Sequence, residues 1–468
     1  MTERWPLLKD VRFWIVLFFV ARLYAITSPP LELAHSWRQT DGAAIARNFY
    51  EIDANIFYPR IDLAGDKSGI AGSEFPLLNY LIYLCSVLFG YDHWYGRLIV
   101  LLFSSIGAFY FFNVIRMRFS ETLALTSTIL LMSSFWFSYS RKIIPDVFAA
   151  SLCIIALYYA LRYLFEGKIV HLLLFVLLGS LGCLSKIIAA SLLTVLALPL
   201  LDKTIALQRK LILSLASALI FCLVVAWYFW WVPHLNAMHG SGAHFFMGMS
   251  YEQGFENIVR DWKAVLRRLF VSPLKYVGAV AFVVSLVVLV ARKQWLILGI
   301  FSLPFLSYLT MIARTGSYMV GDHYYILTMI PAFTFLVACG VDQLPFRKAS
   351  TLVIVVICAE SVGDQFSDFR IKEPFASLAG IEAILDTLSK RNDLIIVNGE
   401  PGNPTFMYFA HRRGWTGPNS DFTSEYLTDK INRGAKFLVV AKKLYGDVNL
   451  HYPISYDSDT FRVYKLVN

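Results

Sequence analysis

The stretch FPLLNYLIYLCSVLFG, residues 75–90, decides how the chain is oriented in a membrane. It is apolar but short, with Pro76 at its start and Gly90 at its end. A helix that crosses a bilayer needs about 17 to 25 mostly apolar residues, so this stretch lies just below that range. If it crosses the membrane, every later loop lies on the other side. The charges of those loops therefore indicate whether this stretch crosses the membrane or stays at its surface.

The composition places the whole chain among membrane proteins. Hydrophobic residues make up 57% of its 468 residues, charged residues make up only 16%, and the mean hydropathy is +0.57. Soluble proteins contain roughly 45 to 50% apolar residues, so a chain this apolar is expected to cross a membrane several times. The net charge of +9 does not indicate nucleic-acid binding, because Lys and Arg lie mostly at the ends of apolar runs.

Eleven other apolar segments are expected to span the bilayer as helices. Several of them are close to the lower limit of length for a span. They lie at residues 11–27, 95–115, 121–139, 146–165, 169–184, 187–201, 209–231, 273–291, 295–312, 323–340 and 349–363.

The positive charges argue against a crossing at residues 75–90. With that stretch at the surface, the short basic clusters all fall on the side of the N-terminus, as the excess of positive charge in cytoplasmic loops requires. Counting it as a span would move the first of these clusters outside. We therefore expect an interfacial or re-entrant helix there and a cytoplasmic N-terminus. The clusters include Arg116 with Arg118, Lys168, Arg292 with Lys293, and Arg347 with Lys348.

This topology divides the chain into a membrane domain, residues 1–363, and a tail, residues 364–468, on the outer face. The membrane domain then has two large outer loops, at 28–94 and 232–272. In the tail, helical periodicity alternates with short apolar runs, which predicts a small soluble α/β domain. The expected helices are 381–391 and 424–434, and the expected strands are 393–399, 435–443 and 460–467.

The first outer loop contains LELAHSWRQTDGAAIARNFYEIDANIF, residues 31–57. Its Asp41 follows His35, Arg38 and Gln39 and is expected to open an amphipathic helix in the membrane interface, with Arg47 and Glu51 on its polar side. A carboxylate there would lie at a membrane surface, ready to act on a substrate. Asp41 or Thr40 could instead only cap the helix, because both residue types are preferred at N-caps.

Three cations depart from the positive-inside pattern. Arg141 and Lys142, in SYSRKIIPD, and Lys186, in GCLSKII, lie at the outer ends of apolar segments. Charge near a bilayer is costly, so such residues pair with a partner, for which a lipid phosphate is suitable. For Lys186, extension of the side chain to the lipid headgroups explains the charge equally well. Asp146 follows Pro145 at a predicted helix start, where a carboxylate can serve function or only capping.

The second outer loop carries His234, His239 and His244. Three histidines can suggest a metal site, but these do not share one helix face, and glycines interrupt the stretch, so the indication is weak. The following YEQGFENIVRDWKAVLRRLF, residues 251–270, has apolar and basic residues at helical spacing. It predicts a basic amphipathic helix on the outer membrane surface.

Four stretches, taken in order, resemble the signature sequences of a known superfamily. They are HSWRQTDGAAIARNF, GSEFPLLNYLIYLCSVLFG, SRKIIPDVFAASL and GDHYYILTMIPAF. They look like those of the GT-C superfamily of membrane glycosyltransferases, in particular the bacterial relatives of dolichyl-phosphate-mannose protein mannosyltransferases and of the lipid A aminoarabinose transferase. Their order and spacing match over roughly residues 11–345, and the topology derived from charge agrees.

The resemblance implies roles for individual residues. Asp41 stands where such enzymes keep the catalytic base that deprotonates the acceptor, although Gly42 replaces the second acid of the protein mannosyltransferase branch and leaves the substrate open. Glu74 and Asp146 could help Asp41 to hold the acceptor or a divalent metal, Mg or Mn. The remaining residues implied to bind substrate are His35, Arg38, Gln39, Arg141, Lys142, Lys186, His323 and Tyr324, of which the last five are candidates for binding the polyprenyl phosphate.

The expected activity is inverting transfer of a sugar from a polyprenyl-phosphate donor, such as undecaprenyl phosphate, to a lipid, glycan or protein. It would take place at the outer face of a bacterial inner membrane. A transporter or flippase of lipid-linked sugars would show inverted repeats, which the sequence lacks. A scaffold protein gives no reason for Asp41, Arg141 and Asp146 to fall on one side of the membrane. A polysaccharide polymerase or ligase would be expected to carry its main outer loop late in the chain.

Overall fold

The computed structural model describes residues 6–32, 35–240, 249–315 and 321–466. By internal contacts the chain divides into two compact units. Unit 1 consists of residues 1–26, 97–229 and 246–366, and unit 2 of residues 27–96, 230–245 and 367–468. The first outer loop therefore belongs to the same unit as the C-terminal tail, although the two are distant in sequence.

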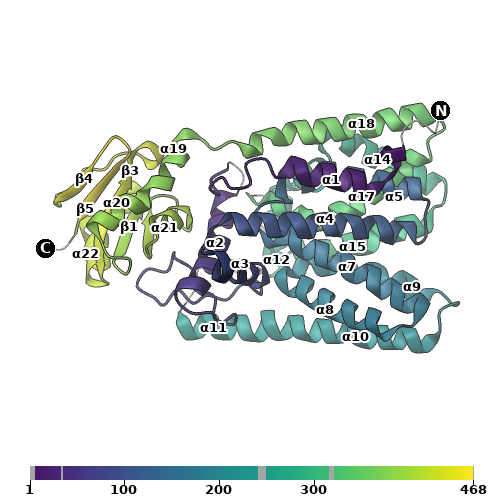
Figure 1. The fold of residues 1–468 in the computed structure, drawn as a ribbon, viewed down its shortest axis with the longest axis horizontal. Helices are drawn as coiled ribbons and strands as arrows, with labels where there is room; N and C mark the ends of the chain where they lie inside the picture. Colours follow the sequence, from purple (N-terminus) through teal and green to yellow (C-terminus); the bar gives the residue numbers. More distant parts are fainter. Residues whose placement is uncertain (1–5, 33–34, 241–248, 316–320, 467–468) are drawn as a thin grey trace. The chain divides into compact units, whose positions relative to one another are not determined.

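Unit 1 is built of helices, and its long helices run side by side in Figure 1. Its α-helices are α1 (Val11–Arg22), α4 (Trp94–Arg116), α5 (Glu121–Ser133), α6 (Trp136–Tyr139), α7 (Pro145–Glu166), α8 (Ile169–Ser185), α9 (Ala197–Leu201), α10 (Leu207–Val225), α12 (Tyr251–Arg260), α13 (Trp262–Leu266), α14 (Lys275–Ala291), α15 (Trp295–Ile312), α17 (Ile330–Asp342) and α18 (Arg347–Asp364). Tighter or wider helical turns are η1 (Pro6–Lys9), η2 (Ile187–Leu196), η3 (Ala226–Trp231), η4 (Arg267–Val271) and η5 (His323–Met329).

Within the described residues, six helical segments are long and apolar enough to cross a membrane. A seventh results if Trp262–Val271 and Lys275–Ala291, which are bent by 84° at their junction, count as one span. Other expected spans coincide with shorter apolar helices, such as the 13-residue α5. The chain is thus a multi-pass membrane protein by its helices, while the number of eleven spans stays a prediction.

Small residues let the helices of unit 1 approach closely. A Cβ atom added to Gly182 in α8 would lie 2.7 Å from the sulfur of Cys153 in α7. One added to Gly340 in α17 would lie 2.2 Å from the Cβ atom of Ser285 in α14. Helices in a membrane gain little from the hydrophobic effect and associate through such close packing. Larger residues at these two glycines would separate the helices.

Unit 2 contains the helices of the first loop, α2 (Ser36–Glu51) and α3 (Leu77–Phe89), together with α11 (Val232–His239). With 13 residues, α3 is shorter than a straight span requires, and its expected place at the membrane surface stays a prediction. The expected start of α2 at Asp41 is wrong. His35 is the N-cap, and the Thr40 hydroxyl donates within the helix to Ser36 O. Asp41 is therefore an interior residue of α2 and does not cap it.

The expected polar face of α2 is also corrected in part. Arg47 is buried, and its guanidinium bonds Asp62 Oδ2 at 2.7 Å and Tyr408 O at 2.9 Å. The guanidinium of Arg47 also lies over the ring of Tyr408, which adds a cation–π interaction. Sequence spacing indicated a solvated side for Arg47, but the tail covers it and supplies its partners.

The described part of the tail forms a five-stranded sheet of order β2-β1-β3-β5-β4. Strand β1 pairs in parallel with β2 and β3, whereas β5 is antiparallel to β3 and β4. The strands are β1 (Leu394–Asn398), β2 (Gly414–Gly417), β3 (Ala435–Ala441), β4 (Ile454–Asp457) and β5 (Phe461–Lys465). The helical segments are η6 (Gln365–Phe369), α19 (Glu373–Ala376), η7 (Ser377–Gly380), α20 (Ile381–Leu388), α21 (Thr405–Ala410), η8 (Asn419–Asp421), α22 (Ser424–Asn432) and α23 (Lys442–Tyr445).

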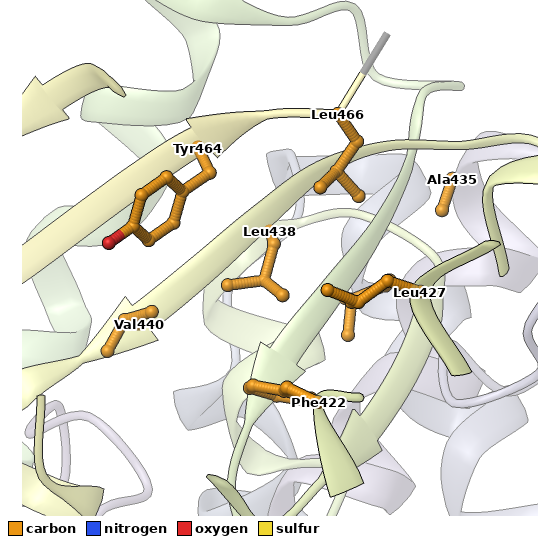
Figure 2. Close-up of a cluster of buried hydrophobic side chains, with 8 residues drawn as sticks. Phe422, Leu427, Ala435, Leu438, Val440, Tyr464 and Leu466 are labelled. Atoms are coloured by element: carbon orange, nitrogen blue, oxygen red, sulfur yellow. The ribbon is translucent and has the colours of Figure 1, made fainter. Parts of the chain in front are cut away.

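One face of this sheet packs against α22. Figure 2 shows Leu427 of α22 facing Leu438 of β3, with Tyr464 of β5 beside them. Leu438 and Tyr464 are register partners on neighbouring strands, so their side chains share this face. Burying each such side chain contributes about 1.5 to 3 kcal/mol. This core fixes β2 and α22, which bear the side chains of a pocket described below.

The first loop and the tail are joined by polar contacts within unit 2. The hydroxyls of Thr40 and Thr405 lie 3.2 Å apart, and those of Tyr91 and Tyr408 lie 2.9 Å apart. His411 bonds Glu51 of α2 at 2.7 Å through Nε2.

His411 also bonds Glu382 of α20 at 2.9 Å through Nδ1. Burial alone would lower the pKa of His411, but its hydrogen bonds to Glu382 and Glu51 outweigh burial and raise that pKa above its ordinary value. The hydrogen bond from His411 is the first cause that lowers the pKa of Glu382, to about 2, so Glu382 stays charged at neutral and mildly acidic pH.

The raised pKa of His411 makes the stability of the loop and tail depend on pH. The stabilisation is present below about pH 6.5, where an unfolded histidine is also protonated, and is lost as the pH rises through the raised pKa. At pH 5.5 we expect His411→Gln to lower the melting temperature by about 2 °C, since part-exposed partners are screened. At pH 9.5 the difference should vanish. Thermal unfolding of the detergent-solubilised protein at the two pH values measures it.

His451 supplies the matched control, because it belongs to the same tail and is exposed. The substitution His451→Gln should leave the melting temperature unchanged at both pH values. An equal loss for His411→Gln at pH 5.5 and pH 9.5 would show that the histidine acts without its charge.

Candidate functional site

Asp41 and Glu74 are held by one guanidinium. Arg38 Nη1 lies 3.1 Å from Asp41 Oδ2, and Arg38 Nη2 lies 2.6 Å from Glu74 Oε1. Arg38 and Asp41 are three residues apart on α2, which places both side chains on one helix face. Asp41 is only 2% exposed. Charge-assisted contacts of this kind fix the position and direction of a carboxylate.

Neighbouring contacts fix the backbone around Asp41. Asn79 of α3 donates through Nδ2 to Gly42 O at 2.6 Å, and Tyr91 donates through its hydroxyl to Ala43 O at 2.9 Å. Gln39, which is fully buried, donates to Glu32 Oε2 at 3.1 Å. The predicted residues His35, Arg38, Gln39, Asp41 and Glu74 thus gather in unit 2. His35 contributes as the N-cap of α2, with its backbone in the left-handed region at φ 58°.

A second group of predicted residues gathers in unit 1. Asp146 lies in the first turn of α7, behind Pro145, and is fully buried. Its Oδ1 lies 3.7 Å from Lys186 Nζ, at the end of α8. The Lys186 ammonium also lies 5.4 Å from the ring centre of Tyr324 and 5.3 Å from that of Tyr325. These contacts favour pairing inside the protein over extension of Lys186 to the lipid headgroups.

Arg141 and Lys142 lie in the turn between α6 and α7, and both are 3% exposed. Lys142 Nζ lies 4.6 Å from the ring centre of Tyr139, and Arg141 donates to Tyr24 O. The Tyr139 ring contacts Phe135, whose ring centre lies 6.3 Å from that of His323. Lys142 and His323 are therefore connected through an aromatic cluster.

Two further charged residues of this group, Asp322 and Arg268, were not predicted from the sequence. Tyr324 donates to Asp322 Oδ2 at 3.1 Å, and Arg268 of η4 interacts electrostatically with both Asp322 and Tyr139. Asp322 was already visible in the GDHYY stretch. Arg268 was assigned to a surface helix at 251–270, but that helix is broken after Arg260 and continues as α13 and the π-helix η4.

The expected metal ligands fit a divalent ion poorly as they are arranged. Each carboxylate has a basic partner, because Arg38 bonds both Asp41 and Glu74, and Lys186 pairs with Asp146. No three His, Cys, Asp or Glu side chains gather into a possible metal site in the described part of the chain. In the second loop, the His234 ring stacks on Trp230, and His244 lies outside the described residues.

Comparison with known proteins agrees with the sequence motifs. Residues 73–230 match the family model of dolichyl-phosphate-mannose-protein mannosyltransferases. A search of curated protein sequences found no match.

Solved structures share the fold at low sequence identity. ArnT from Cupriavidus metallidurans in the apo state aligns with a TM-score of 0.62 and 14% identity, over 97% of this chain and 98% of ArnT. ArnT bound to undecaprenyl phosphate gives a TM-score of 0.61 at 14% identity, with the same coverage.

A more distant similarity links the chain to an oligosaccharyltransferase. The archaeal enzyme AglB from Archaeoglobus fulgidus, in complex with an inhibitory peptide and a dolichol-phosphate, aligns with a TM-score of 0.53 and 13% identity. The alignment covers 92% of this chain and 70% of AglB. Residues 73–230 thus match a mannosyltransferase family model, and the chain shares its fold with ArnT and AglB.

Proposed function

We propose that this protein transfers a sugar from a polyprenyl-phosphate donor to a lipid, glycan or protein acceptor at the outer face of a bacterial inner membrane. The buried Asp41, held in place by Arg38, is the observation that carries the proposal. The fold supports the donor class, because an ArnT structure holds undecaprenyl phosphate and an AglB structure holds a dolichol-phosphate.

Asp41 acts as the general base in this proposal. Its carboxylate takes the proton of the acceptor's hydroxyl or amine as the acceptor atom forms a bond to the anomeric carbon. The bond between that carbon and the phosphate oxygen breaks, and the electron pair leaves with the polyprenyl phosphate. A single displacement from the opposite face inverts the anomeric centre. A positioned base typically contributes about 10² to 10⁴ in rate.

The cations gathered in unit 1 suit the phosphate of a lipid-linked donor. Lys142, Lys186 and Arg268 are connected to one another through Asp146, Asp322 and the tyrosines, and Arg141 precedes Lys142 in the same turn and donates to Tyr24 O. Among the described residues of this group, four cations and two carboxylates leave an excess of two positive charges. A phosphate monoester carries about −1.5 to −2 at pH 7, so the charges complement each other. Preorganised cations stabilise the charge that develops on a leaving group.

The guanidinium of Arg38 lies between Asp41 and Glu74 and neutralises charge on both carboxylates. We therefore propose that the chain's own cations neutralise the charges of the reaction, and that no divalent ion is needed. Purified protein incubated with excess EDTA is expected to retain its rate of sugar transfer to within about twofold, as measured by transfer of radiolabelled sugar. A loss of activity that Mg²⁺ or Mn²⁺ restores would contradict this proposal.

Removing the catalytic base should strongly slow sugar transfer. We expect Asp41→Asn to lower the transfer rate by about 10² to 10⁴, because asparagine keeps the shape but cannot take the acceptor proton. Transfer is measured with purified protein, and folding is checked by its melting temperature and gel filtration in detergent. The matched control is Asp53→Asn in the same loop, whose side chain is 44% exposed and pairs with Arg60. Full activity of Asp41→Asn would rule out Asp41 as the base.

Removing a cation that binds the donor phosphate should lower the catalytic efficiency with the donor. We expect Lys142→Gln to lower kcat/KM for the lipid-linked donor by about 10 to 10². Lys142→Arg should recover most of this loss, since it keeps the charge. Lys168→Gln, which removes an exposed lysine between α7 and α8, serves as the control and should have no effect. Equal kinetics for wild type and Lys142→Gln would exclude Lys142 from the donor site.

A further inference from the structure

Unit 2 contains a pocket of about 410 Å³ to which Asp41, Arg38 and Glu74 do not contribute. The loop 61–70, the end of α11, strand β2 and helix α22 enclose it. Its volume lies in the range of small-molecule sites, about 300 to 1,000 Å³. The side chains that matter for its chemistry are Lys67, His239, Trp415, Thr416, Lys430 and Arg433.

The pocket is built by a close approach of the first loop to the edge of the sheet. Gly65 N donates to Gly414 O at 2.8 Å, so the loop covers the edge strand β2. A Cβ atom on Gly65 would lie 2.4 Å from Trp415 Nε1, and Gly65 has φ +60°. Only glycine fits this place without strain. The loop is therefore shaped to pass beside the indole ring that lines the pocket.

The charge of the pocket is positive. Lys430 of α22 and Arg433, the C-cap residue of that helix, lie 5.7 and 5.3 Å from the ring centre of Trp415. Their partners are Asp429, 2.7 Å from Lys430, and Asp66, 2.5 Å from Arg433. Lys67, which also lines the pocket, donates to Gly240 O. Among the described lining residues and these partners, three cations face two carboxylates, which leaves an excess of one positive charge.

Two lining residues carry buried polar atoms that lack a hydrogen-bond partner within the described part of the chain. They are Nε2 of His239 and the hydroxyl oxygen of Thr416. Leaving such an atom unpaired costs about 1 to 3 kcal/mol, so native proteins usually satisfy it. A ligand rich in hydroxyl groups offers the donors and acceptors that both atoms need.

We infer that this pocket binds an anionic sugar unit of the acceptor, a saccharide ring that carries a phosphate or a carboxylate. The inference rests on the proposed function and adds the class of acceptor to it. The indole of Trp415 provides an apolar surface with a polar edge for a sugar ring. Lys67, Lys430 and Arg433 provide charge-assisted hydrogen bonds for its anion. His239 and Thr416 provide hydrogen bonds for its hydroxyl groups.

Binding of small probes to the purified full chain tests this inference without any transfer reaction. Calorimetric titration compares glucose 1-phosphate with glucose and with inorganic phosphate. We expect glucose 1-phosphate to bind at least about tenfold more tightly than either, because only it uses both the indole and the cations. If inorganic phosphate binds equally tightly, the pocket does not recognise the sugar ring. If glucose binds equally tightly, the pocket does not recognise the anion. Either result would overturn the inference.

Substitutions then locate the binding. Lys430→Gln should weaken binding of glucose 1-phosphate about tenfold, and Lys430→Arg should restore it if the fold is intact. Lys436→Gln is the matched control, because Lys436 lies on β3 of the same sheet, is 51% exposed and does not line the pocket. Unchanged binding in Lys430→Gln would place the ligand elsewhere and overturn the inference.

The two proposals fail separately in this design. Asp41→Asn should bind glucose 1-phosphate as the wild type does, because Asp41 does not line the pocket. Normal transfer by Asp41→Asn would remove the proposed catalytic base and leave the measured sugar binding intact. Absence of glucose 1-phosphate binding to the wild type would remove the acceptor pocket and leave the catalytic proposal intact.

Discussion

A charged side chain that is buried away from water needs an opposite charge or several hydrogen bonds. This constraint fixes the positions of the candidate site residues in both units of the protein. In unit 2 the guanidinium of Arg38 joins two carboxylates, Asp41 and Glu74. In unit 1 Lys186 joins Asp146 at the start of α7. Removing one member of such a pair leaves a buried charge alone, at a cost of about 3 to 5 kcal/mol. The paired groups therefore hold each other in fixed positions before any substrate arrives.

Fixed charges suit the transfer of a sugar from a lipid phosphate. Such a reaction needs a base at the acceptor and positive charge at the leaving phosphate, and both act most strongly where water is excluded. The apolar helices α7 and α8, which approach closely at Gly182, bear Asp146 and Lys186 at their ends. The tail likewise excludes water from part of the first loop, because it buries Arg47 beside Asp62 and Tyr408.

Sequence patterns succeeded where one residue type dominated a stretch. Strands β1, β3 and β5 were predicted from short segments rich in apolar residues, and all three were confirmed. Strands β2 and β4 were missed, since GWTG and ISYD have four residues each and no such run. The start of α2 was placed too late, because Thr40 and Asp41 are residue types preferred at N-caps, whereas the structure makes SWRQT the first turns of the helix.

The sequence by itself determined the class of the protein, the positions of its apolar helices and the residue types of its candidate site. These properties depend on composition and on local periodicity, which neighbours in the chain decide. Only the tertiary structure decided that Arg38 joins Asp41 to Glu74, that Lys186 meets Asp146, and that the tail belongs with the first loop. Such pairs come from distant parts of the chain. Their selection depends on which charges packing removes from water together, and local sequence does not carry that information.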